Sequence, residues 1–281
     1  KKPDEKKIES SENQLEDLIS KLTKIRKVRN ESNGFIYSVA ISILNEKKYC
    51  NIKQVVNDLK ISSDQGNIFS SFLLGFIYEN ELNMNKSFKY YKKSFKDGNT
   101  SGIFRIGLCY DRGIGVKQDF NKAKEYYEQA VEHGCSVSMT NLGALYENGQ
   151  GVEQDYNKAK EYYERAAELG DLAAMNNLGV LYCNGRGVKQ DYKKAKEYYE
   201  QAAKLGNSTA MNLLGSLYSD GKGVKQDYNK AKEYYERSAK LDNSDAMNSL
   251  GFLYDNGQGV EQDYEKAKEY YERAAELGNS Y

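Results

Sequence analysis

Apolar and polar positions follow a helical period along most of the chain, and one pattern returns every 36 residues. Ala174, Leu178 and Leu181 have i, i+4, i+7 spacing, which predicts an apolar stripe along one helix. A second stripe follows over residues 195–202. A Gly-rich segment at 185–187 separates the two stripes. The unit therefore predicts two antiparallel helices joined by a loop.

Glycines mark the repetition of this unit. Gly107, Gly143, Gly179, Gly215 and Gly251 are each 36 residues apart, within five full units that span residues 99–278. A fixed period of 20–50 residues is typical of stacked repeat architectures. A weaker copy precedes them, in which the loop is four residues shorter. The repeated pattern predicts an all-α solenoid.

Each glycine of the unit has an expected structural role. Gly185 and Gly206 follow the two helices, where glycine accepts the left-handed conformation of a helix C-terminus. Asp191 is the expected N-cap of the second helix. Gly179 lies inside the first helix, where it costs about 1 kcal/mol relative to alanine. Its repetition predicts that the two helices of a unit approach each other closely at this point.

We expect three segments along the chain. Residues 1–33 form an N-terminal amphipathic helix or linker, residues 34–66 a degenerate capping helix pair, and residues 67–281 six repeats. The expected repeats are about 67–98, 99–134, 135–170, 171–206, 207–242 and 243–278. A solenoid needs atypical terminal repeats as caps, which is the role we assign to the second segment.

The unit resembles the Sel1-like repeat, a relative of the tetratricopeptide repeat with a longer, Gly-rich loop. The stretch Met175–Gly206, MNNLGVLYCNGRGVKQDYKKAKEYYEQAAKLG, carries the resemblance in both helices and in the loop. Tetratricopeptide repeats proper run 34 residues and usually place a proline after the second helix, whereas the single proline here is Pro3. The resemblance implies a right-handed α-solenoid (superhelix) of antiparallel helix pairs. It also implies a non-catalytic adaptor that assembles complexes.

Some Sel1-like proteins have other roles, so an enzyme is the alternative. One secreted bacterial branch has reported β-lactamase activity, and some protist arrays are fused to protein kinases. The secreted branch joins its repeats by cysteine pairs, and the matching positions here hold no cysteine: Ala130 and Ser138, Ala166 and Ala174, Ala202 and Ala210. The four cysteines, Cys50, Cys109, Cys135 and Cys183, are therefore predicted to be free thiols. Free thiols favour a reducing, cytoplasmic location over a secreted or luminal one.

Composition and motifs exclude several other classes. The chain of 281 residues balances 41 basic with 41 acidic side chains, which argues against a nucleic-acid partner. No apolar run approaches the roughly 20 residues that membrane insertion requires. The single histidine, His133, makes neither a triad nor a zinc site, and Gly149-Gln150-Gly151 lacks the ending of a phosphate-binding loop. We predict no catalytic residue, metal or cofactor.

Positions that differ between units, together with a row that returns once per unit on the same side (Thr140, Asn176, Asn212 and Asn248), identify the candidate binding surface. They lie on the face of the first helix opposite its packing residues, the face that lines the concave surface of a solenoid. The predicted set is Arg105, Leu108, Asp111, Thr140, Asn141, Glu147, Asn176, Asn177, Val180, Asn212, Leu213, Asn248, Ser249 and Phe252.

An extended peptide or protein segment is the expected partner of this surface. An Asn amide both donates and accepts hydrogen bonds, so a row of them is suited to the peptide main chain. We assign that role to Asn141, Asn176, Asn177, Asn212 and Asn248, and side-chain selection to Arg105, Leu213 and Phe252. The alternative is that these asparagines stabilise turns or contacts between repeats.

Both ends of the chain suggest further contacts. Residues 8–29 read as an amphipathic helix, which either packs on the first repeat, forms a coiled-coil homodimer or ends an upstream domain. Residues 278–281 begin the pattern of another first helix. The apolar face of the last repeat is therefore expected to be exposed, or to be covered by further residues or a second copy.

Overall fold

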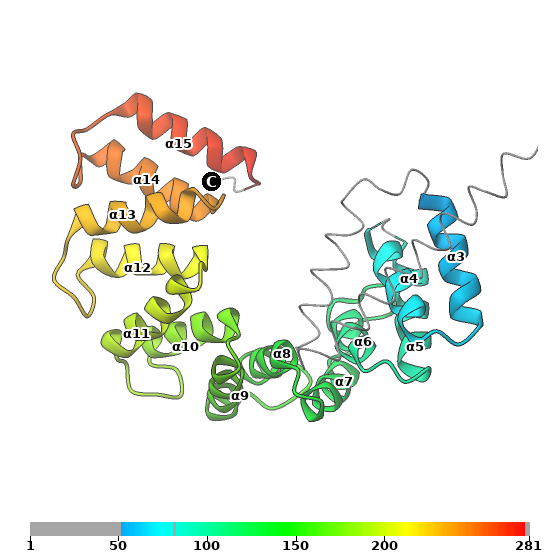
Figure 1. Ribbon diagram of the computed structural model, residues 1–281. Helices are drawn as coiled ribbons and strands as arrows, with labels where there is room; N and C mark the ends of the chain where they lie inside the picture. Colours follow the sequence, from blue (N-terminus) through cyan, green and yellow to red (C-terminus); the bar gives the residue numbers. More distant parts are fainter. Residues whose placement is uncertain (1–51, 81–82, 279–281) are drawn as a thin grey trace, which may run out of the picture. The chain divides into compact units, whose positions relative to one another are not determined.

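The computed structural model describes residues 52–80 and 83–278, and every regular element in these ranges is an α-helix (Figure 1). The helices are α3 (Ile52–Asp64), α4 (Ile68–Asn80), α5 (Met84–Lys96), α6 (Ser101–Arg112), α7 (Phe120–Glu132), α8 (Ser136–Asn148), α9 (Tyr156–Glu168), α10 (Leu172–Asn184), α11 (Tyr192–Lys204), α12 (Ser208–Asp220), α13 (Tyr228–Ala239), α14 (Ser244–Asn256) and α15 (Tyr264–Glu276). The predicted all-α fold is confirmed.

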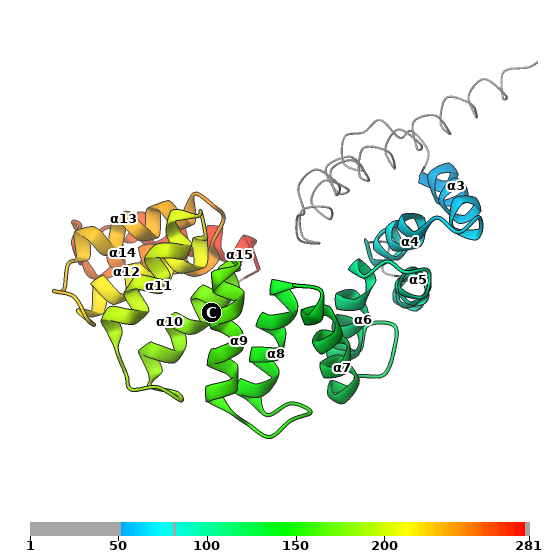
Figure 2. The same ribbon diagram turned by 60° about the horizontal axis from the view of Figure 1, so that its bottom comes forward.

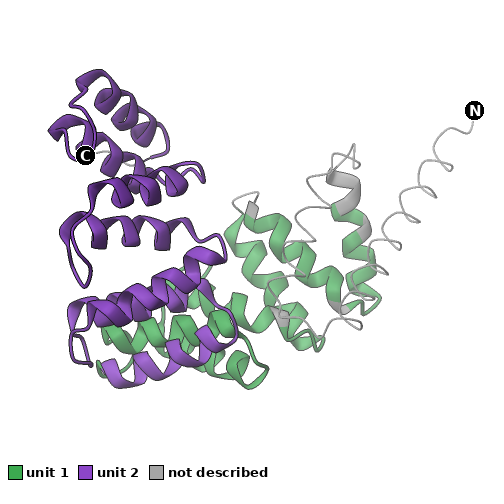
Figure 3. Ribbon diagram, turned by 60° about the vertical axis from the view of Figure 1, so that its left-hand side comes forward, with its two compact units in different colours: residues 1–154 green, residues 155–281 purple. Residues whose placement is uncertain are grey.

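The chain divides into two compact units, residues 1–154 and 155–281 (Figure 3). The described part of unit 1 holds α3–α8, and unit 2 holds α9–α15. Within each unit, consecutive helices pack against one another. Figure 2 shows α12, α13 and α14 side by side in unit 2. No helix of the described residues is both long and apolar enough to span a membrane.

Side-chain caps and glycines set the helix ends as predicted. Asp171 precedes α10, and its side chain accepts a hydrogen bond from the backbone N–H of Ala174 at 2.9 Å. Gly185 ends the same helix with φ of 67°, in the left-handed region. Asp191 caps α11 by accepting from the N–H groups of Lys193 and Lys194, each at 3.0 Å. These contacts satisfy backbone groups that the helix itself leaves open.

The two helices of a repeat meet where the first helix carries its internal glycine. A Cβ atom at Gly179 would overlap the ring of Tyr199, and one at Gly215 would lie 2.5 Å from Cε1 of Tyr235. Both tyrosines are buried. The predicted close approach is therefore confirmed, and a tyrosine ring of the second helix fills the space that the glycine leaves.

Successive repeats in unit 2 share one apolar core. Leu214 and Leu217 of α12 lie in one cluster with Tyr199 and Ala203 of the preceding second helix, α11. The helices α13 and α14 form the equivalent cluster one repeat later. The second helices α11 and α13 therefore each pack between their own first helix and the first helix of the next repeat.

The Gly-rich loops also contact the preceding repeat. Gly187, with φ of 64°, lies against the start of α9, where its added Cβ would meet the backbone of Tyr156. Gly223 and Gly259 lie in the same way against Tyr192 and Tyr228. The second glycine of each loop thus allows contact between repeats.

The N-terminal expectations fall mainly outside the described residues. The whole of the predicted helix within residues 1–33 lies outside the described residues. Most of the predicted capping pair at 34–66 lies outside them as well. In that pair, α3 is the described helix, and it contacts α4. The division of the chain into these segments stays a prediction.

Candidate functional site

The first helices carry the predicted binding residues in both units. In unit 1, α6 holds Arg105, Leu108 and Asp111, and α8 holds Thr140, Asn141 and Glu147. In unit 2, α10 holds Asn176, Asn177 and Val180, α12 holds Asn212 and Leu213, and α14 holds Asn248, Ser249 and Phe252. Leu108, Thr140, Asn176 and Asn248 are buried, and the others are at least partly accessible.

Unit 1 contains a polar network around Arg105. The Arg105 Nη1 atom lies 3.3 Å from Oε1 of Glu79 on α4. The hydroxyl of Tyr91 donates to the other carboxylate oxygen of Glu79 at 2.5 Å. The guanidinium is therefore already paired within the protein. Sequence comparison between repeats missed Glu79, because it lies in the degenerate first copy of the unit.

A thiol lies close to this network. Burial raises the pKa of Cys109 to about 12, and the nearby Glu79 carboxylate acts in the same direction. The thiol is therefore protonated at neutral pH and is a poor nucleophile. Cys109, Cys135 and Cys183 are free cysteines, and Cys50 lies outside the described residues.

Tyrosine hydroxyls of the second helices use several variable positions of the first helices as acceptors. The Tyr127 hydroxyl donates to Oδ2 of Asp111 at 2.9 Å, and the Tyr199 hydroxyl donates to Sγ of Cys183 at 3.7 Å. Burial is the largest cause of the raised pKa of both tyrosines. Asp111 therefore has a role inside its own repeat. The signal in the sequence was that Asp111, Glu147 and Cys183 differ in type but can all accept a hydrogen bond.

Removing these hydroxyls should have unequal effects. We expect Tyr127→Phe to lower the free energy of unfolding by about 1 kcal/mol, because the acceptor is a half-buried carboxylate. Tyr199→Phe should cost less than about 0.5 kcal/mol, because a thiol sulfur is a weak acceptor. Urea denaturation of both variants measures the difference. If both variants lost the same free energy of unfolding, the hydrogen bond to the Asp111 carboxylate would be no stronger than the one to the Cys183 sulfur.

The asparagine row makes contacts between repeats. Nδ2 of Asn176 donates to Oδ1 of Asn207 at 3.0 Å, and the same oxygen caps α12 through the N–H of Ala210. Oδ1 of Asn212 accepts from Oγ of Ser249 at 3.5 Å, the limit of a hydrogen bond. In unit 1, Thr140 donates to the carbonyl of Ser136 in its own helix.

Two buried polar atoms of this row have no hydrogen-bond partner. They are Oδ1 of Asn176 and Nδ2 of Asn248. A buried polar group without a partner typically costs 1–3 kcal/mol, so each such atom in a folded protein requires an explanation.

No cluster of metal ligands occurs in the part of the chain that the structure describes. His133 lies at the C-cap of α7, and its backbone N–H bonds to the carbonyls of Ala130 and Val131. A histidine at that position suits the helix dipole when it is charged.

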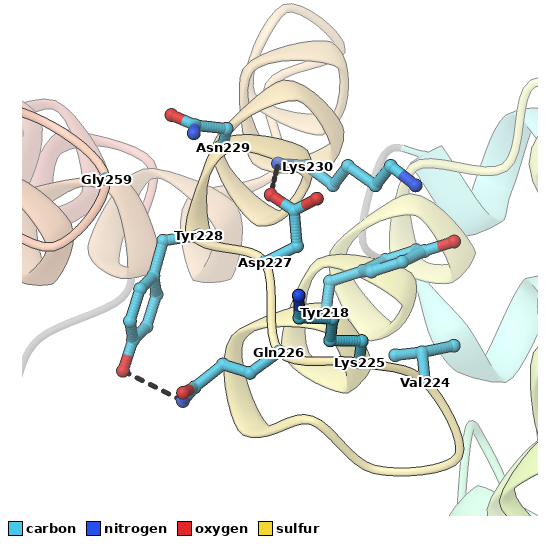
Figure 4. A pocket seen from close by; sticks show the side chains of 9 residues that line it. All are labelled: Tyr218, Val224, Lys225, Gln226, Asp227, Tyr228, Asn229, Lys230 and Gly259. Atoms are coloured by element: carbon cyan, nitrogen blue, oxygen red, sulfur yellow. Dashed lines mark hydrogen bonds between the residues drawn. The ribbon is translucent and has the colours of Figure 1, made fainter.

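An open pocket of about 660 Å³ lies where a Gly-rich loop of unit 2 meets the next repeat (Figure 4). Lys230 lies over the ring of Tyr218 at 5.2 Å, and Asp227 caps α13 through the N–H of Lys230. Gly259 of the next repeat completes the wall. Similar pockets occur beside Tyr254 and beside Met84, so this pocket is a recurring feature of the loops.

Comparisons with known proteins agree with this architecture. The family model of the Sel1 repeat matches residues 69–99, 100–135, 136–171, 172–207, 208–243 and 244–279. No curated protein matches the chain.

Among solved structures, a Sel1 repeat protein from Oxalobacter formigenes is 31% identical, with a TM-score of 0.72 over 79% of this chain and 94% of that one. A protective antigen of uropathogenic Escherichia coli with the same type of fold is 30% identical, with a TM-score of 0.67 over 80% of this chain. The match spans 49% of the length of that antigen. An immunity protein from Pseudomonas aeruginosa, 23% identical over 69% of this chain and 74% of that one, has a TM-score of 0.52 and shares the fold.

Proposed function

The chain belongs to the Sel1 repeat family, and we propose that it is a non-catalytic scaffold that binds a protein segment on the face of its first helices. Stacked repeats present extended surfaces suited to partners of this kind. The observation that carries the proposal is Phe252, a large aromatic side chain that is 51% exposed on α14. The equivalent position in the other full repeats holds Leu108, Ala144, Val180 or Ser216, so the aromatic ring occurs in one of these repeats only.

Unit 2 offers the better-defined part of this surface. Leu213 and Val180 are partly exposed on α12 and α10, and with Phe252 they supply one apolar side chain from each first helix. Aromatic side chains at the centre of an interface often dominate its binding energy. We propose that Phe252 anchors an apolar side chain of the partner, and that Asn177, Leu213 and Ser249 contact the chain on either side of it.

Substituting Phe252 tests the proposal. We expect Phe252→Ala to weaken binding of the partner at least tenfold, because it removes the anchor. Leu241→Ala is the matched control, since Leu241 is 50% exposed but lies just after a second helix. Partners retained by the wild type would be identified by quantitative mass spectrometry, purified, and titrated against the three proteins by calorimetry. Equal affinity for all three would rule out the first-helix face.

The asparagine clamp remains part of the proposal for Asn141, Asn176, Asn177, Asn212 and Asn248. The variant Asn176→Ala distinguishes a role of Asn176 in binding the partner from its role in the hydrogen bond to Asn207. If the amide binds the partner, affinity falls; if it only joins repeats, stability falls by about 1 kcal/mol and affinity is unchanged. The partner titration and a urea melt of this variant measure the two effects. We expect a loss in both.

Arg105 and the acidic positions of unit 1 form the second part of the proposed surface. Arg105→Glu is a poor test of it, because the new carboxylate would face Glu79. Asn141→Ala is a better variant, since Asn141 is a half-buried residue of α8 in the same unit. The enzyme alternative is tested separately with nitrocefin, for which we expect no turnover.

We also propose that the protein works in a reducing compartment. The free thiols of Cys109 and Cys135 are buried, which is compatible with permanent reduction. Two of its Asn-x-Ser/Thr sequons are unsuited to glycosylation in the folded state, because Asn99 is fully buried and Asn207 caps α12. Mass spectrometry of the intact protein from its own cells tests this location, and a disulfide or a glycan would contradict it.

A further inference from the structure

A row of exposed leucines lies along unit 2, at the ends of its second helices. The turn after each of these helices holds a leucine at the same position of the repeat: Leu169, Leu205, Leu241 and Leu277. Their exposed fractions lie between 48% and 61%. The first three are each followed by another helix, which leaves them exposed. The equivalent positions of unit 1 hold the polar residues Asp97 and His133, so the row belongs to unit 2.

Backbone hydrogen bonds close the turns that carry the two central leucines, Leu205 and Leu241. The N–H of Asn207 donates to the carbonyl of Ala202 at 3.1 Å, and the equivalent bond closes the turn of Leu241 at 3.4 Å. Bonds of this kind complete the C-terminus of a helix. The central leucines are therefore presented by short, closed turns rather than by long loops.

The central leucines have exposed basic neighbours. Lys204 and Lys240 immediately precede them, and Arg237 lies one turn earlier in α13. Within the described residues, no carboxylate lies within ion-pair distance of these three cations, whereas lysines in the middle of the same two helices pair with glutamates at 3.1 and 3.6 Å. Asp242 is the one acidic residue in the two turns. A cation near a helix C-terminus also suits the helix dipole, but that does not explain an exposed leucine beside it.

The charges around the two outer leucines are different. Each of these leucines has one arginine and one glutamate among the four residues before it, so the two charges balance. Exposed apolar side chains and an excess of positive charge therefore coincide at the centre of the row.

This combination fits an anionic lipid surface better than a protein partner. The core of a protein interface is depleted of lysine, whereas here a lysine adjoins each central leucine. At a membrane surface, a leucine can enter the boundary between headgroups and acyl chains while the neighbouring lysine keeps its ammonium group in water. The open pockets described above have none of these leucines in their walls. A second copy of the chain would place one basic patch against another, which is unfavourable.

We propose that the centre of this row, formed by Lys204, Leu205, Arg237, Lys240 and Leu241, binds the surface of a membrane that contains anionic lipids. The two leucines enter the lipid boundary, and the three cations contact the lipid headgroups. Such peripheral contact requires no membrane-spanning helix. Cytoplasmic leaflets carry anionic lipids, which agrees with the reducing compartment proposed above. The row is separate from the first-helix face of the proposed function, so each of the two proposals can fail alone.

Flotation of the full chain with vesicles tests this inference directly. The probe vesicles hold three parts phosphatidylcholine to one part phosphatidylserine, and vesicles of phosphatidylcholine alone are the reference. We expect binding to the anionic vesicles only. This binding should be lost when salt is raised from about 0.15 M to about 1 M, because the Debye length falls from about 8 Å to about 3 Å.

Variants of the full chain identify the residues that bind. Leu205→Ser combined with Leu241→Ser should weaken vesicle binding at least tenfold, as should Lys204→Gln combined with Lys240→Gln. Asp242→Gly should strengthen it several-fold, because it removes the one carboxylate of the two turns. Circular dichroism should be unchanged in all of them.

Two matched controls and a fluorescent reporter complete the test. Phe252→Ala and Lys225→Gln change an exposed apolar residue and an exposed lysine elsewhere in unit 2, and both variants should bind as the wild type does. Because the chain has no tryptophan, Leu205→Trp supplies a single indole. Its emission should shift to the blue on anionic vesicles, whereas that of Phe252→Trp should not.

Several results would overturn the inference. They are no binding to anionic vesicles, equal binding of the wild type and the double leucine variant, and unshifted emission from Leu205→Trp. Self-association, or capture of an acidic protein, that depends on the same leucines in the absence of vesicle binding would also overturn it, because a protein would then be the occupant.

Discussion

Replacing Gly179 with valine should lower the free energy of unfolding by about 2–3 kcal/mol. The new side chain would occupy space held by the ring of Tyr199, which is buried. Overpacking of this kind typically costs 1–3 kcal/mol. Valine gains some helix propensity over glycine, which reduces the loss by a few tenths of a kcal/mol. Guanidinium denaturation followed by circular dichroism measures the change.

Two further variants show whether the clash is the cause. Asn177→Val places the same residue at a half-exposed position of the same helix, and we expect a change within about 0.5 kcal/mol. Tyr199→Leu alone should be destabilising, but in combination with Gly179→Val it should cost less than the two separate losses added together. If Gly179→Val were as stable as Asn177→Val, close contact between the helices would not be the reason for the glycine.

The 36-residue period made the helix pair predictable, because the same local signals return in each of the five full repeats. Gly179, Gly185 and Asp191 are short-range features, and the sequence around each of them determines its role. Their helix ends and close contact agree with the structure. The contact of Gly187 with Tyr156 was harder to predict from the sequence, because it joins two different repeats.

The candidate site was harder to predict, because variation between repeats has more than one cause. Asp111 and Cys183 hold equivalent positions but differ in type, and this variation placed Asp111 in the predicted binding surface. Both accept a hydrogen bond from a tyrosine that is the same in each repeat. The repeat pattern shows that the tyrosine is constant, but it does not show which side chain accepts a hydrogen bond from the tyrosine hydroxyl.

Pairing across repeats explains the remaining differences. Asn176 reaches the N-cap residue Asn207, and Arg105 reaches Glu79 in a copy with a shortened loop. Both contacts depend on how neighbouring repeats stack, which local sequence does not specify. Phe252 is the opposite case, since its exposure agrees with the surface role expected from its variability.

Gly187→Ala is expected to lower the free energy of unfolding by about 2–5 kcal/mol. Its φ of 64° lies in the left-handed region, which costs alanine roughly 1–2 kcal/mol. The added Cβ would also lie 3.0 Å from the backbone carbonyl carbon of Tyr156 and overlap the side chain there. Backbone atoms at the start of α9 cannot move aside as a flexible side chain can, so overpacking adds about 1–3 kcal/mol.

Gly185→Ala is the matched control, because Gly185 lies in the same loop with φ of 67°. Its nearest neighbour is Cβ of Gln190 at 3.3 Å, within its own repeat. Both variants pay for the left-handed conformation, so their difference in free energy of unfolding isolates the contact between repeats. We expect Gly187→Ala to be the less stable by at least 1 kcal/mol. Hydrogen exchange should also show faster exchange at the start of α9 in Gly187→Ala alone. Equal stability of the two variants would mean that the loop does not hold successive repeats together.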